Sequence, residues 1–110
     1  TGRMKDFYDI YYLARTFDFD GAKLQTAISR TLERRGTPYE KDSFKRILTL
    51  AEDVDMQKRW KIFLKTIKDD MLEFSVVIEG IRKFLEPVFD AIVNEVEWQK
   101  TWDCTNAMWA

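Results

Sequence analysis

The sequence predicts an all-α protein, a helical bundle of about five to six helices. Gly and Pro are scarce, with four and two residues among 110, which is typical of long helices joined by few tight turns. Apolar residues recur with the i, i+3, i+4 spacing of one helix face in successive segments. No segment alternates apolar and polar residues over the length that a half-buried strand needs.

The first half of the chain contains three of the expected helices. The first covers about residues 5–17. The second covers about residues 21–35, with Asp20 as its N-cap and Gly36 as its C-terminal cap. The third runs from about residue 42 to residue 51.

The second half continues with a helix over about residues 55–68, for which Asp55 is the expected cap. Another apolar stripe follows over residues 74–85. Pro87 either kinks this helix or starts a new one, with Glu86 as its cap. Residues up to 97 carry the stripe onward.

These elements divide the chain into a helical bundle domain, residues 1–97, and a tryptophan-rich tail, residues 98–110. The tail lacks helical signals after Asp103. Two interpretations of its tryptophans stay open. They fold back over the bundle, or they anchor a partner protein, since exposed tryptophan is enriched at interfaces.

Composition excludes several classes of protein. Hydrophobic residues make up 45% of the chain and charged residues 34%, as in globular domains. One cysteine excludes an internal disulfide, and one cysteine without histidine excludes a zinc site. No apolar run approaches 18 residues, so we expect a cytoplasmic protein with no membrane partner.

The charge balance differs between the two halves of the chain. Residues 1–50 carry ten Lys/Arg against seven Asp/Glu (+3), and residues 51–110 carry eight against twelve (−4). A phosphate-rich partner is therefore expected to prefer the N-terminal half.

Residues 3–11, RMKDFYDIY, crowd two acids and two cations into the first turns of an apolar helix. Helical periodicity places Asp6 on the line of Leu13 and Phe17, a face expected to be buried. An unpaired buried charge costs several kcal/mol. Asp6 must therefore be paired, bound to a metal ion or part of a site.

Three interpretations of these acids stay open. They complement the helix macrodipole as ordinary N-terminal residues, or they form a buried network with arginines of the second helix, Arg30, Arg34 or Arg35. In the third, they belong to an active site. Asp6 and Asp9 are three residues apart, so their Cβ atoms lie about 5–6 Å from each other. Such a pair can hold a divalent cation, or one acid can accept a proton.

Residues 3–14 resemble the R-x-K-D-hydrophobic-Y-D-[IL]-Y-x-L segment of the AbiEii family, nucleotidyltransferase-like toxins of bacterial toxin–antitoxin and abortive-infection systems. Residues 19–35 resemble the family's next helix, an A-I-x-x-T-[FL]-x-x-R pattern. Residues 83–88 are similar to its late F-L-x-P element. The resemblance covers about the first 90 residues and is strongest in the first 35.

The resemblance implies that the chain is the C-terminal helical part of a longer protein. An N-terminal α/β domain would carry the glycine-rich motif and paired carboxylates that bind an NTP and Mg²⁺, and this chain has no G-S motif followed by D-x-D. The implied catalytic residues are Lys5, Asp6 and Asp9. Arg3 and Lys5 would neutralise phosphate charge.

The implied reaction transfers a nucleotide from an NTP to an acceptor hydroxyl, with tRNA or another RNA as the acceptor. No metal ligand set is expected within this chain alone, and the chain alone should be inactive. Three basic residues could hold the RNA backbone, although a solvated helix face is the more common explanation for such residues: Arg30, Arg34 and Arg35.

The rival hypothesis comes from a different functional class. It treats the chain as a non-catalytic helical interaction module. Its charged N-terminal segment would then only dock against another domain or a cognate antitoxin.

Overall fold

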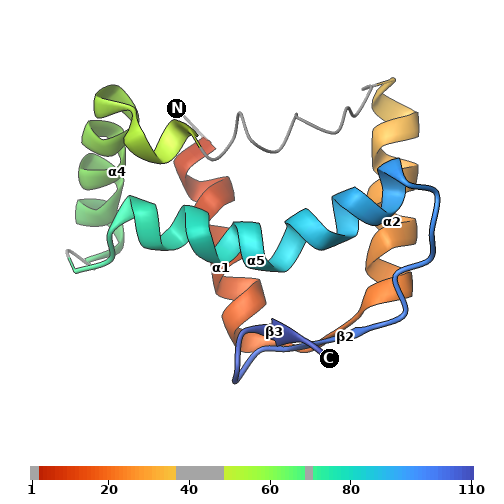
Figure 1. Cartoon of the computed structure of the whole chain (residues 1–110). Coiled ribbons are helices and arrows are strands. Elements are labelled where there is room, and N and C mark those ends of the chain that lie inside the picture. Colours follow the sequence, from red (N-terminus) through yellow and green to blue (C-terminus); the bar gives the residue numbers. More distant parts are fainter. Residues whose placement is uncertain (1–2, 37–48, 69–70) are drawn as a thin grey trace.

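The structure of the chain is a computed structural model that describes residues 3–36, 49–68 and 71–110. Its elements are α1 (Arg3–Thr16), β1 (Phe19–Asp20), α2 (Gly21–Arg35), the 3-10 helix η1 (Leu50–Glu52), α4 (Val54–Ile67), α5 (Phe74–Val93), β2 (Thr101–Asp103) and β3 (Met108–Trp109). In Figure 1, α5 crosses the molecule, with α4 at one end and α2 at the other. The helix expected over residues 42–51 lies mostly outside the described residues.

Local capping chemistry sets several of these boundaries. The Asp20 side chain accepts hydrogen bonds from two backbone amides in the first turn of α2, and Gly36 closes the helix with φ 62°. Both predicted caps are confirmed. For α4 the N-cap is Asp53, which accepts from the Met56 amide at 3.2 Å. The prediction of Asp55 as this cap is wrong, because the helix begins two residues earlier.

The long helix α5 passes through Pro87 without a break. Of the two alternatives at Pro87, the start of a new helix capped by Glu86 is therefore wrong. Proline removes one intrahelical hydrogen bond, and the helix tolerates this loss because its buried stripe continues on both sides: Phe74, Val77, Ile78, Ile81, Phe84, Val88 and Ala91. The described residues accordingly form four α-helices rather than five to six.

A small antiparallel sheet corrects the all-α prediction. Its strand order is β1-β2-β3, with Phe19 opposite Trp102 and Trp102 opposite Trp109. Strands of two or three residues are too short to show alternation in the sequence. Their pairing joins segments from opposite ends of the chain, which no local pattern reveals.

The core consists of two clusters that share α5. One lies between α1, α4 and α5 and contains eight buried residues: Met4, Tyr11, Trp60, Leu64, Phe74, Val77, Ile78 and Ile81. The other is centred on Ala14, Phe84 and Trp102 and packs the sheet against α1 and α5.

The C-terminal tryptophans belong to this second cluster. Trp102 is 1% exposed, and its ring lies 5.0 Å from that of Phe84 and 5.4 Å from that of Trp109, measured between centroids. Its indole N–H donates to the Ala14 carbonyl at 2.7 Å. The interpretation in which the tryptophans fold back over the helices is confirmed.

Candidate functional site

The candidate site lies on helix α1, and the orientation of that helix decides which residues can act. Tyr11 and Ala14 are buried, whereas Leu13 and Phe17 are 42% and 51% exposed. Asp6, on the same line as these two, is exposed. The prediction that Asp6 faces the core is wrong.

Close packing against α5 explains this orientation. A Cβ added to Gly80 of α5 would lie 2.6 Å from a ring carbon of Tyr11, so the Tyr11 ring packs directly against α5 at this glycine. Helical periodicity gives α1 two apolar faces, one with Met4, Tyr8 and Tyr11 and one with Leu13 and Phe17, and the second was expected to be buried. The contact with α5 selects the face that contains Tyr11.

The outward face of α1 carries an ion pair close to Asp6. Lys5 Nζ lies 2.7 Å from Asp9 Oδ2, one helical turn away. This hydrogen bond, together with the negative charge of Asp9, raises the pKa of Lys5 above its usual value. Lys5 therefore stays charged at neutral pH.

The interpretation of a buried network with the arginines of α2 is wrong. Asp6 is exposed, and among the described residues the partner of Asp9 is Lys5. All three arginines of α2 are exposed as well, and that helix stands at the other end of α5 from α4: Arg30, Arg34 and Arg35. Their role in binding RNA stays a prediction. Arg3 begins α1, and its side chain lies outside the described part of the structure.

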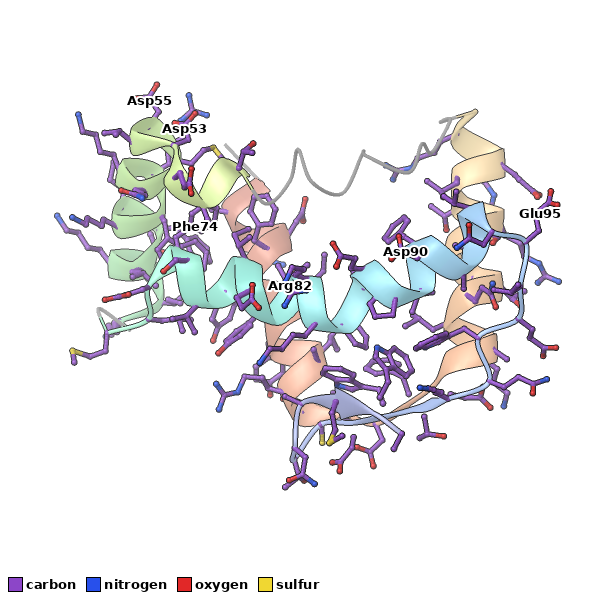
Figure 2. All side chains as sticks on the ribbon, in the orientation of Figure 1. Asp53, Asp55, Phe74, Arg82, Asp90 and Glu95 are labelled. Carbon is purple, nitrogen blue, oxygen red and sulfur yellow. The ribbon has the colours of Figure 1, made fainter. Side chains whose placement is uncertain are left out.

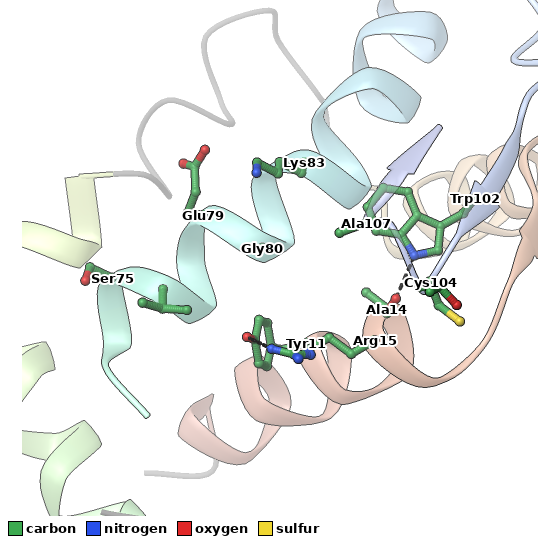
Figure 3. Close-up of a pocket in the computed structure, with 12 residues that line it drawn as sticks. Tyr11, Ala14, Arg15, Ser75, Glu79, Gly80, Lys83, Trp102, Cys104 and Ala107 are labelled. Atoms are coloured by element: carbon green, nitrogen blue, oxygen red, sulfur yellow. Dashed lines mark hydrogen bonds between the residues drawn. The ribbon is translucent and has the colours of Figure 1, made fainter. Parts of the chain in front are cut away.

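A cavity of about 450 Å³ lies on another side of α1, between that helix, α5 and the β2–β3 hairpin. Figure 3 shows Tyr11 and Arg15 on one wall, with Glu79 and Lys83 on the other. Arg15 donates to the Tyr11 hydroxyl at 2.7 Å. None of the catalytic residues expected from the sequence lines this cavity, so it is separate from the outward face of α1.

Sequence reasoning did not assign a role to the exposed cations of α4. The helix carries Lys58, Arg59, Lys61 and Lys65, all exposed. Arg59 lines a hollow of about 420 Å³ together with Met4 of α1. The lysines of α4 recur every three or four residues, which indicates one basic side of a helix, but the sequence does not show that α4 packs beside α1.

The described residues contain neither a metal-binding cluster nor a membrane-spanning helix. Within residues 3–36, 49–68 and 71–110, no group of three or more His, Cys, Asp or Glu side chains is arranged to hold a metal ion. In that part of the chain no helix has the length and apolar character needed to cross a membrane.

Comparison with known protein families gives one match. The family model described as "Nucleotidyl transferase AbiEii toxin, Type IV TA system" matches residues 1–99. The chain belongs to the AbiEii toxin family. No curated protein and no solved structure matches it. The AbiEii match includes α1 and the whole of the candidate site, and it ends before the β2–β3 hairpin.

Proposed function

We propose that this AbiEii chain is the helical, C-terminal part of a nucleotidyltransferase toxin, and that the outward face of α1 forms one wall of its active-site cleft. The observation that carries the proposal is the position of Lys5, Asp6 and Asp9 on the side of α1 away from α5, where Lys5 and Asp6 are exposed and the Asp9 side chain is 48% exposed. Leu13 and Phe17 are exposed on the same side. Large apolar side chains beside charged ones suit contact with a further domain.

The acids and the cations of this face have different roles in the proposed reaction. Asp6 or Asp9 accepts the proton of the acceptor hydroxyl or orients that hydroxyl, because both carboxylates reach outward from one turn of the helix. Lys5 and Arg3 would neutralise the charge of the NTP phosphates. An exposed ion pair breaks easily, so Lys5 can leave Asp9 when a triphosphate approaches.

Two carboxylates do not make a complete site for Mg²⁺, which prefers octahedral oxygen coordination, and the described residues hold no third one beside them. The expected Mg²⁺ and NTP are therefore assigned to an N-terminal domain that the resemblance implies. That domain is also the partner expected for the outward face of α1. RNA as the acceptor and a cognate antitoxin remain further expectations.

The test uses the full-length protein with Asp6→Asn, Asp9→Asn and both together. We expect transfer of a labelled nucleotide and toxicity to fall at least about tenfold for one of the single variants and further for the double variant. Asp55→Asn is the matched control, since Asp55 is also an exposed acid in the first turn of a helix. Transfer at the wild-type rate in the double variant would contradict the catalytic proposal and favour a docking surface.

Stability separates a catalytic role from a structural one. Both acids are on the outward face, so their substitution should shift the melting temperature by no more than about 2–4 °C. A larger shift would show that the acids support the fold.

A further inference from the structure

Helix α4 presents a strongly basic surface. We call Lys58, Arg59, Lys61 and Lys65 the α4 basic face; all four are exposed, and none forms a salt bridge within the described residues. In Figure 2, nitrogen atoms gather on the side of α4 that points away from the molecule. The net negative charge of residues 51–110 conceals this surface, because the acids of that half lie mostly on other elements.

The buried side of α4 fixes the direction of these cations. Trp60 is 2% exposed and donates its indole N–H to the Leu72 carbonyl at 2.8 Å. Leu64 is buried one turn later. With that side held in the core, the lysines at positions 58, 61 and 65 form a row about 10 Å long on the solvent side.

Helix α4, which carries the basic face, packs beside the first turns of α1, and Arg59 is the cation nearest to that helix. The rings of Phe63 and Tyr8 lie 5.8 Å apart, and Arg59 shares a hollow with Met4, the neighbour of Lys5. The basic residues of α2 stand instead at the far end of α5 (Figure 1).

We propose that the α4 basic face binds the phosphate backbone of an RNA acceptor and directs it toward α1. This proposal rests on the proposed function and adds the surface on which the acceptor lies. A row of cations that form no salt bridge with the described residues fits a polyanion with regularly spaced charges. Lysine is depleted at protein interfaces. A helix that lies on a membrane needs its apolar face for lipid, whereas α4 buries Trp60 and Leu64 in the core.

The test measures the affinity of the 110-residue chain for a fluorescein-labelled 20-nucleotide oligouridylate by anisotropy, between 50 and 200 mM salt. The variant replaces three lysines by glutamine, which keeps helix propensity: Lys58→Gln, Lys61→Gln and Lys65→Gln. Loss of three phosphate contacts should flatten the slope of log K against log salt by about 2. The fall in affinity over this fourfold salt range should then be about 16-fold smaller than for the unmodified chain.

The control variant removes the same charge from α2, with Arg30→Gln, Arg34→Gln and Arg35→Gln. It also tests the RNA-binding role predicted for these arginines. We expect the slope of log K against log salt to change less than half as much in this variant as in the lysine variant. Equal slopes for the two variants, or an unchanged slope for the lysine variant, would overturn the proposal.

Two further measurements separate this proposal from its alternatives. Replacing the three lysines should flatten the salt slope by the same amount in a chain that also carries Asp6→Asn and Asp9→Asn, so a failure of the catalytic proposal leaves the binding surface standing. Sedimentation with phosphatidylglycerol vesicles should show no lysine-dependent binding. Lysine-dependent binding to these vesicles without binding to RNA would refute the assignment of RNA as the partner.

Discussion

Replacing Trp102 by alanine should strongly destabilise the chain. Trp102 is 1% exposed and contacts the rings of Phe84 and Trp109, and removal of a buried aromatic side chain costs about 3–5 kcal/mol. The indole also donates to the Ala14 carbonyl, one of the last four carbonyls of α1, which have no partner within the helix. Trp102→Phe keeps much of the packing but leaves this carbonyl unsatisfied, at a cost of about 1–3 kcal/mol.

Urea unfolding followed by circular dichroism at 222 nm measures these free energies without depending on tryptophan fluorescence. The expected order of stability is unmodified chain, Trp102→Phe, then Trp102→Ala, whose melting temperature should fall by about 12 °C or more. Met108→Ala is the matched control, because Met108 lies on the same hairpin and is 52% exposed. A Trp102→Ala variant as stable as Met108→Ala would refute the assignment of the hairpin to the core.

Three other predictions follow from the same packing. In Gly21→Ala the new Cβ would overlap the Lys100 carbonyl oxygen, so thermal unfolding should show a loss of about 1–3 kcal/mol; unchanged stability would contradict this close contact. Hydrogen bonding to Asp18 raises the pKa of Cys104. The pH at which alkylation by iodoacetamide reaches half its maximal rate should therefore lie above the pKa of an ordinary thiol, and Asp18→Asn should lower this pH. Deletion of residues 98–110 removes the aromatic cover of α1 and α5; the shortened chain should melt at lower temperature and bind the dye ANS, and full stability without the tail would instead support an independent domain of residues 1–97.

The sequence predicted the first two helices well because their signals are local. Both helices agree with the structure to within two residues, at Arg3–Thr16 and Gly21–Arg35, and the caps of the second follow from short-range hydrogen bonds. The sheet could not be predicted, since Phe19 and Trp102 meet only through the tertiary fold. The sequence could not show that α5 continues through Pro87, because burial on both sides of this residue outweighs the missing hydrogen bond.

The orientation of α1 shows why the candidate site was identified for the wrong reason. Two apolar strips flank the acids, and only the contact of Tyr11 with Gly80 decides which strip is buried. Family resemblance pointed to Asp6 and Asp9 independently of burial. The structure therefore corrects the electrostatic argument, and the residues themselves remain candidates.

Exposure of the acids gives the functional hypothesis a cleaner test than burial would have done. Substitution of a buried, paired carboxylate costs several kcal/mol, so a loss of activity could follow from unfolding alone. Asp6 is exposed, and the ion pair of Lys5 with Asp9 is exposed as well, so Asn at either position leaves the fold little changed. A loss of nucleotide transfer in these variants, with an unchanged melting temperature, would therefore report chemistry or substrate contact at the outward face of α1. The same substitutions in a mere docking surface would weaken contact between domains and leave the transfer rate of the assembled protein intact.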